Sequence, residues 1–129
     1  MANILFVENH NVFAAQVSRA FLGAHEVTVV PSLAQARAEL ATRRFEVVLI
    51  DYDLDDGKGV ELIGELHAAA DRPFTIGVSS HDLGNTAMLS AGADAICGKM
   101  DFRNIESVIQ RALSSNSARP ADAPKDARG

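Results

Sequence analysis

An unbroken apolar run that ends in carboxylates is the feature that most restricts the fold of this chain. In the predicted strand EVVLI, residues 46–50, every residue after Glu46 is apolar, and Asp51, Asp53, Asp55 and Asp56 follow it. A strand without polar alternation is typical of a parallel strand that helices cover on both faces. The sequence therefore predicts an α/β protein in which one buried strand ends at a group of acidic side chains.

Strand and helix patterns alternate along most of the chain. Further apolar and β-branched runs predict strands at residues 3–7, 25–30, 74–79 and 94–97. Apolar residues at helical spacing predict helices around residues 12–22, 33–41, 60–70, 83–91 and 102–113. Gly23 and Gly92 follow the first and fourth of these helices and can end them. Five strands alternating with five helices predict a parallel sheet with helices on both faces.

The chain length of 129 residues fits one domain, which we assign to residues 1–114. From residue 115 the sequence reads SSNSARPADAPKDARG, with no apolar residue larger than alanine. Such a segment cannot bury enough apolar surface to offset the entropy of ordering it. We therefore expect a disordered tail or a linker stub at residues 115–129.

Charge and composition argue against several classes of protein. The net charge is −5, and the basic residues form no stripe, which argues against direct contact with nucleic acid. No apolar run approaches the roughly 18 residues of a membrane helix, and the N-terminus does not resemble a signal peptide. The lone Cys97 fits a buried core position in a reducing compartment. We expect a cytoplasmic protein.

Polar residues that follow the predicted strands are expected to meet at one edge of the sheet. Glu8 and Asn9 follow the first strand, Asp51 the third, Ser79 the fourth and Lys99 the fifth. In open α/β sheets, ligands bind beyond the carboxyl ends of the strands. A carboxylate, a hydroxyl, an ammonium group and oxygens that can hold a metal ion together suit phosphoryl transfer. Aspartate is an established nucleophile that forms an aspartyl phosphate.

Four segments resemble the response-regulator receiver family, the phospho-acceptor domains of two-component signalling. They are, in order along the chain, ILFVENH, VVLIDYDLDDGKG, VSSH and AGADAICGK. Their order and spacing are close to those of the family, and the resemblance covers residues 3 to about 114. It implies a flavodoxin-like, doubly wound (βα)5 three-layer sandwich with a parallel five-stranded sheet in the order 2-1-3-4-5.

The resemblance also implies roles for single residues. Asp51 stands at the phospho-acceptor position, Ser79 at the Ser/Thr position and Lys99 at the lysine position. Glu8 and Asn9 stand at the acidic pair. The phosphoryl donor would be a histidine kinase or a phosphotransfer protein.

A Mg²⁺ ion is the cofactor that the resemblance implies. Its ligands would be the Asp51 carboxylate, the backbone carbonyl of Asp53, Glu8 through water, and Asn9. Since Asn is also a preferred residue at a helix N-cap, a capping role for Asn9 remains an equal alternative.

Three departures from the family pattern affect these expectations. Asn9 replaces an aspartate, so that Mg²⁺ affinity should fall. Met100 replaces the proline after the lysine, which makes a cis peptide bond there costly by about 2.5–4 kcal/mol. Ile96 replaces the aromatic switch residue and offers no ring or hydroxyl. Asp55, which stands where the family often has proline, is expected with Asp56 to form a turn.

The expected signal is a conformational change at the face formed by the fourth helix, fifth strand and fifth helix. A downstream protein or an output domain would read this face, and homodimer formation is left open. The domain itself would not be an enzyme. His10 and His81 are expected to be solvated or hydrogen-bonded locally, since no metal-ligand spacing links them to a cysteine.

Two alternatives are kept. The departures at Asn9, Ile96 and Met100 favour a degenerate receiver, an interaction module that works without phosphorylation. The segment IDYDLDDG also resembles the DxD motif of aspartate-dependent phosphatases, with Asp51 as nucleophile and Asp53 as acid–base. That motif is usually on the first strand of its sheet, whereas here it follows the third.

Overall fold

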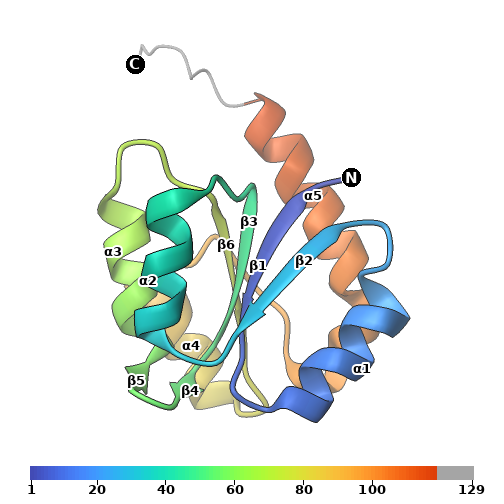
Figure 1. The fold of residues 1–129 in the computed structure, drawn as a ribbon, viewed down its shortest axis with the longest axis horizontal. Helices are drawn as coiled ribbons and strands as arrows, with labels where there is room; N and C mark the ends of the chain where they lie inside the picture. Colours follow the sequence, from blue (N-terminus) through green and yellow to red (C-terminus); the bar gives the residue numbers. More distant parts are fainter. Residues whose placement is uncertain (119–129) are drawn as a thin grey trace.

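A five-stranded parallel sheet forms the centre of the molecule in the computed structural model, which describes residues 1–118 (Figure 1). Its strands are β1 (Asn3–Val7), β2 (Glu26–Val30), β3 (Val47–Asp51), β6 (Phe74–Val78) and β7 (Ala95–Ile96). They pair in the order β2-β1-β3-β6-β7, and every pair is parallel. When the strands of this sheet alone are counted, the order is 2-1-3-4-5, which confirms the expected topology.

Helices cover both faces of this sheet. They are α1 (Asn11–Phe21), α2 (Leu33–Thr42), α3 (Gly59–Ala68), α4 (Asp82–Ala91) and α5 (Ile105–Ala118). Figure 1 shows α1 and α5 on one side of the sheet and α2, α3 and α4 on the other. This three-layer arrangement is the predicted doubly wound sandwich.

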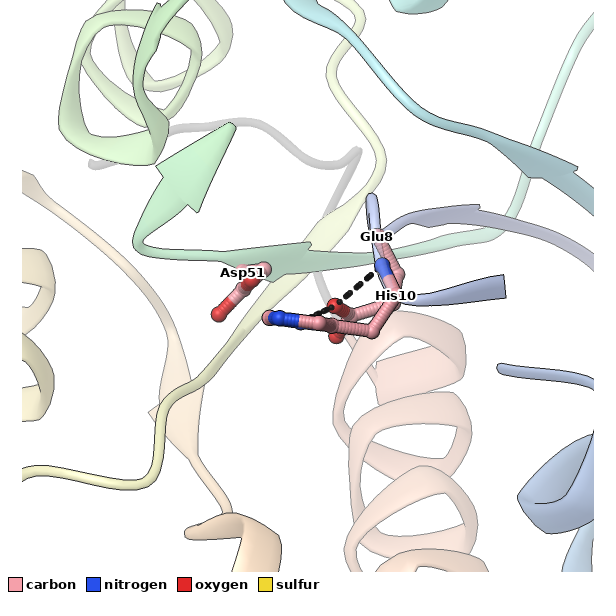
Figure 2. Close-up of side chains that lie close together, drawn as sticks. All are labelled: Glu8, His10 and Asp51. Carbon is pink, nitrogen blue, oxygen red and sulfur yellow. Dashed lines mark hydrogen bonds and ion pairs between the residues drawn. The ribbon is translucent and has the colours of Figure 1, made fainter. Parts of the chain in front are cut away.

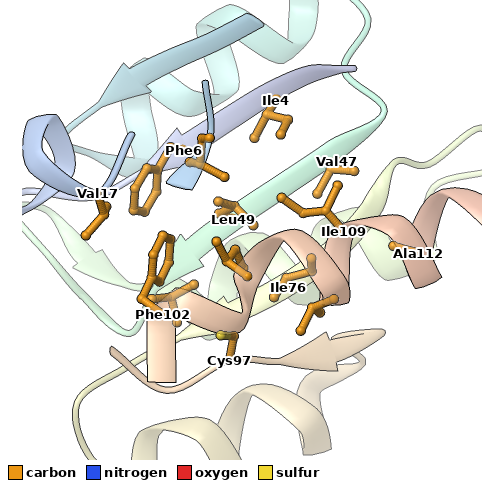
Figure 3. Close-up of a cluster of buried hydrophobic side chains, with 14 of the residues drawn as sticks. Ile4, Phe6, Val17, Val47, Leu49, Ile76, Cys97, Phe102, Ile109 and Ala112 are labelled. Carbon is orange, nitrogen blue, oxygen red and sulfur yellow. The ribbon is translucent and has the colours of Figure 1, made fainter. Parts of the chain in front are cut away.

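Alternating side chains of the central strands divide the core into two clusters. Ile4 and Phe6 of β1 pack with α1 and α5, as does Leu49 of β3 (Figure 3). Leu5 and Val7 point to the opposite face and pack with α2, α3 and α4. All residues from Ile4 to Val7 are fully buried. Because each central strand contributes side chains to a core on both faces of the sheet, its sequence is apolar without alternation.

A small antiparallel hairpin follows β3, and the sequence did not predict it. Its strands are β4 (Asp53–Leu54) and β5 (Gly57–Lys58). Asp55 and Asp56 form its turn, as predicted. The hairpin returns the chain to α3, whose first residue donates its backbone N–H to the carbonyl of Tyr52 at 2.7 Å.

The last predicted strand is shorter than expected. β7 comprises only Ala95–Ile96, whereas the sequence predicted residues 94–97. The Asp94 carboxylate instead accepts the backbone N–H of Thr75 at 2.9 Å and pairs with Arg72 at 3.0 Å. These contacts hold the start of the segment at the edge of the sheet without a strand conformation.

Helix ends also differ from the predictions. α3 ends two residues before the predicted position, and α4 begins at Asp82 rather than Leu83. Gly92 ends α4 in a left-handed conformation, with φ 114°, which confirms its predicted role. The last predicted helix begins as a 3-10 segment, η1 (Lys99–Asn104), and continues as α5.

The last helix passes the predicted start of the tail. α5 continues to Ala118, so that residues 115–118 are helical, and the boundary between domain and tail stays a prediction. The remaining positions of the predicted tail, 119–129, lie outside the described residues. The other strand boundaries agree with the predictions to within one residue, with β2 beginning at Glu26 and β6 ending at Val78.

Candidate functional site

The carboxyl ends of the central strands bring predicted site residues together. Glu8 follows β1, Asp51 ends β3, Ser79 follows β6 and Lys99 opens η1 after β7. Backbone hydrogen bonds continue beyond the strand ends and reach these positions. One of them joins the N–H of Lys99 to the carbonyl of Ser79 at 3.0 Å. Glu8, Asp51 and Ser79 are all buried polar residues.

Asp51 lies in a confined and charged environment. Its exposed fraction is 4%. Oδ1 accepts the backbone N–H of Tyr52 at 2.9 Å, and Oδ2 lies 3.5 Å from Nζ of Lys99. Loss of hydration on burial, followed by repulsion from the Glu8 carboxylate, raises the pKa of Asp51 to about 6, against the opposing attraction of Lys99.

Glu8 is fully buried and surrounded by donors. Nζ of Lys99 lies 3.0 Å from Oε1 and 3.2 Å from Oε2. The backbone N–H of His10 donates to Oε2 at 3.1 Å, and Nδ1 of the same residue lies 3.0 Å from this oxygen. Lys99 therefore connects Glu8 to Asp51 and partly neutralises both.

Ser79 is held by the start of the next helix. Its Oγ accepts the backbone N–H of His81 at 3.2 Å, and its carbonyl accepts the amide of Asn85 at 3.4 Å. Gly84 lies so close that a Cβ there would be 2.6 Å from Oγ of Ser79 and 3.2 Å from Cγ of Tyr52. The hydroxyl therefore lies in a tightly packed corner between β6 and α4.

Asn9 turns toward the β4–β5 hairpin rather than toward a helix end. Its Nδ2 donates to Oδ1 of Asp55 at 3.2 Å, and Oδ1 of Asn9 is buried without a hydrogen-bond partner among the described residues. The N-cap of α1 is His10, which makes no side-chain capping bond. An orphaned amide oxygen at the residue that follows Glu8 fits the oxygen-rich ligand set that Mg²⁺ requires.

Asp53 does not extend its side chain into the site. Its carboxylate pairs with Lys58 across the hairpin, and both side chains are exposed. Only its backbone carbonyl is left for the predicted metal-ligand role.

His10 is a neighbour of the site that sequence reasoning set aside. Donor atoms of Glu8, His10 and Asp51 all lie within 4.8 Å of one another (Figure 2). The prediction of a local hydrogen bond for His10 is correct, but that bond goes to a site carboxylate. Position alone, two residues after Glu8, was the available signal. His81 is exposed at the N-cap of α4, without a side-chain capping bond.

Asp56 has a second role beyond its turn. Its carboxylate accepts the backbone N–H of Leu33 at 2.7 Å and that of Ala34 at 3.0 Å, at the start of α2. These bonds lower the pKa of Asp56. The acidic loop is thus tied to α2, a contact between segments that no local pattern reveals.

Cys97 is buried, as predicted, and belongs to the core cluster under α5. Burial, with a smaller effect of the Asp101 charge, raises the pKa of its thiol.

Within residues 1–118, no helix combines the length and apolar character that crossing a lipid bilayer requires.

Together, fold and site define a class of doubly wound α/β domains that carry a buried aspartate and a lysine at the edge of the sheet. The family model described as response regulator receiver domain matches residues 4–110. The chain therefore belongs to this family and is the receiver domain of a two-component response regulator. Members of this family are typically phosphorylated by a kinase.

A curated relative and solved structures agree with this assignment. KdpE, the KDP operon transcriptional regulatory protein of Escherichia coli K12, is 28% identical over 127 residues, which cover 96% of this chain and 56% of KdpE. The chain thus spans just over half the length of this relative.

A CheY-like receiver domain from Methanospirillum hungatei JF-1 aligns with a TM-score of 0.78 at 22% identity, over 91% of this chain and 97% of that one. The Thermotoga maritima response regulator DrrB, an OmpR/PhoB homologue, aligns with a TM-score of 0.77 at 19% identity, over 90% of this chain and 54% of DrrB. At these identities the two structures support the fold.

Proposed function

We propose that this domain accepts a phosphoryl group on Asp51 from a phosphohistidine of a sensor kinase or a phosphotransfer protein. The observation that carries the proposal is the environment of Asp51. Its carboxylate is buried at the carboxyl edge of β3, and Oδ2 lies 3.5 Å from Nζ of Lys99. A carboxylate in such a position can act as a nucleophile while a fixed cation offsets the incoming negative charge.

In the proposed step, a carboxylate oxygen of Asp51 attacks the phosphorus atom. The P–O bond to Asp51 forms while the P–N bond to the donor histidine breaks. The electron pair of the broken bond stays on the imidazole nitrogen of the donor, which takes a proton from solvent. Asp51 must be ionised to act, so its raised pKa of about 6 favours transfer above that pH.

Lys99 and Ser79 would respond to the phosphoryl group. Lys99 now shares its charge between Glu8 and Asp51, and new phosphoryl oxygens would draw it toward Asp51. The Ser79 hydroxyl would donate to one of these oxygens. Charge-assisted hydrogen bonds of this kind contribute about 1.5–3 kcal/mol each. Because these contacts exist only with the phosphoryl group present, they can bias a two-state element.

Mg²⁺ is the cofactor that we propose for this site. The Asp51 carboxylate, Glu8 through water, the amide oxygen of Asn9 and the backbone carbonyl of Asp53 would hold it. The orphaned oxygen of Asn9 supports this set. When bound, the ion would neutralise charge on the transferred phosphoryl group.

The proposed output is a change at the face formed by α4, β7 and α5. A downstream protein or an output domain would read this face, without direct contact between this domain and nucleic acid. The domain would act as a cytoplasmic signalling module rather than as an enzyme, and a homodimer is one form that its output can take.

The test is phosphoryl uptake from acetyl phosphate, with and without Mg²⁺, read by intact mass. We expect a Mg²⁺-dependent gain of one phosphoryl group. Asp51→Asn should abolish the gain. Asp53→Asn is the matched control, since it changes a nearby exposed carboxylate and keeps the backbone carbonyl, and it should retain the gain.

A degenerate receiver is the second candidate, and the departures at Asn9, Ile96 and Met100 favour it. It predicts no uptake, from acetyl phosphate or from a kinase, by a folded protein. Loss of signalling in a folded Asp51→Ala variant would contradict it. Membership of the receiver family argues against the phosphatase, as does the pairing of the Asp53 carboxylate with Lys58.

A further inference from the structure

The acceptor site contains a nitrogen donor that the proposed oxygen ligands do not include. We propose that His10 is a metal ligand of this domain, and that it makes the site bind first-row transition-metal ions such as Mn²⁺ and Co²⁺ more tightly than Mg²⁺. The inference deepens the proposed function, because it names the class of cation for the same site.

The geometry brings His10 within reach of a shared ion. Donor atoms of Glu8, His10 and Asp51 lie within 4.8 Å of one another. Opposite ligands of an ion with bonds of roughly 2.1 Å are about 4.2 Å apart, so only a small contraction is needed. Glu8 would bind such an ion directly, whereas we propose that it reaches Mg²⁺ through water. Glu8 and Asp51 are buried, whereas the His10 side chain is 67% exposed and can make this movement.

The nitrogen of His10 that faces Glu8 is the one that can share an ion with it. Nδ1 lies 3.0 Å from Oε2 of Glu8. Neighbouring ligands of an octahedral ion with bonds of roughly 2.1 Å are about 3.0 Å apart, so these two atoms have the separation of two ligands of one ion. Nδ1 would bind the ion in the tautomer that carries its proton on Nε2. Figure 2 shows the His10 ring extending from its loop toward Asp51.

The charges of the site weaken its attraction for every divalent cation, so that the type of ligand decides between ions. Asn9 contributes no charge, and Nζ of Lys99 lies 3.0 Å from Glu8 and 3.5 Å from Asp51. Mg²⁺ prefers oxygen ligands and gains little from an imidazole. Transition-metal ions bind imidazole nitrogen well, with affinity that rises from Mn²⁺ to Co²⁺. His10 thus compensates for the missing carboxylate with these ions and not with Mg²⁺.

The test is a calorimetric titration of the metal-free domain with Mg²⁺, Mn²⁺ and Co²⁺ at one fixed pH, without a phosphoryl donor. We expect Mn²⁺ to bind about tenfold or more tightly than Mg²⁺, and Co²⁺ more tightly still. His10→Ala should lower the affinity for Mn²⁺ and Co²⁺ about tenfold or more. It should leave the affinity for Mg²⁺ within about twofold.

Two variants locate the effect. His81→Ala removes the other histidine at this edge of the sheet, outside the cluster, and should leave all affinities unchanged. Asp51→Asn should weaken binding of every ion. The visible absorption spectrum of bound Co²⁺ should change in His10→Ala, which a general loss of stability would not produce. Circular dichroism confirms that each variant is folded.

Three results would overturn the proposal. The first is that His10→Ala loses affinity for Mg²⁺ and for Mn²⁺ to the same extent. The second is that His10→Ala binds all three ions as tightly as the wild type does. The third is that the wild-type domain binds no ion or binds Mg²⁺ most tightly. Since the titration needs no phosphoryl group, the ion preference can hold in a domain that takes up no phosphoryl group. Mg²⁺-dependent uptake together with an unchanged affinity for Mn²⁺ in His10→Ala would support the proposed function and contradict this inference.

Discussion

At the scale of the residue, the central feature is Asp51, whose carboxylate lies in an environment that makes its ionisation unfavourable. Asp51 is buried beside Glu8, and its pKa rises from an ordinary 3.8 to about 6. The folded protein therefore holds a proton on Asp51 more tightly than the unfolded chain does. As the pH rises from about 4 to above 6, the folded state loses the stability that this proton provides.

The first prediction follows from the direction of this change in stability with pH. Asp51→Asn removes the ionisable group, so it should raise the free energy of unfolding by about 1–3 kcal/mol at pH 7.5 relative to the wild type. The gain should shrink toward zero near pH 4. Urea unfolding in the presence of EDTA, at both pH values, measures it. Asp53→Asn, at an exposed position, serves as the control, and a gain that does not depend on pH would contradict the interpretation.

At the scale of the element, the start of α3 lies in close contact with the end of β3. A Cβ on Gly59 would lie 2.1 Å from the backbone carbonyl oxygen of Asp51 and 2.8 Å from Cγ2 of Ile50. Only a residue without a side chain allows the helix to begin there. The close approach explains why a glycine follows the β4–β5 hairpin.

Gly59→Ala should therefore destabilise the domain, by about 1–3 kcal/mol or more, through overpacking against a backbone that cannot move freely. Gly64→Ala is the matched control on the same helix, because nothing lies within 4 Å of a Cβ at that position. It should stabilise the domain by about 0.5–1 kcal/mol through helix propensity. Urea unfolding of both variants decides the point, and equal effects would refute the packing argument.

At the scale of the whole molecule, one core cluster connects the site to the helices α1 and α5. The ring of Phe102 stacks on Phe6 with centroids 5.8 Å apart and meets Phe13 edge-on at 5.7 Å. Phe102 lies in η1, the segment that begins with Lys99. The buried ring of Phe102 thus fixes in the hydrophobic core the same segment that carries Lys99.

Phe102→Ala should lower the free energy of unfolding by about 3–5 kcal/mol, because it empties a buried site that three rings share. Leu83→Ala, at a position that is 85% exposed, should change it by less than about 0.5 kcal/mol. Chemical denaturation monitored by circular dichroism measures both. A small effect at Phe102 would mean that the cluster repacks without loss.

Local patterns were sufficient for the architecture. The run at residues 46–50 predicted a strand covered on both faces, and β3 has two cores against it. The resemblance to receivers implied the strand order, which the structure has. Glu8, Asp51 and Lys99 could be expected to meet because strand ends meet in a parallel sheet, and the contacts among them confirm it.

The contacts that cross the fold could not be predicted in this way. The bond between His10 and Glu8, the capping of α2 by Asp56, and the approach of α3 to Asp51 depend on how the elements pack. Periodicity and turn signals describe a residue and its near neighbours, and they decided which segments are strands and helices. Tertiary packing decided which charges are buried together, because burial and distance are properties of the assembled chain.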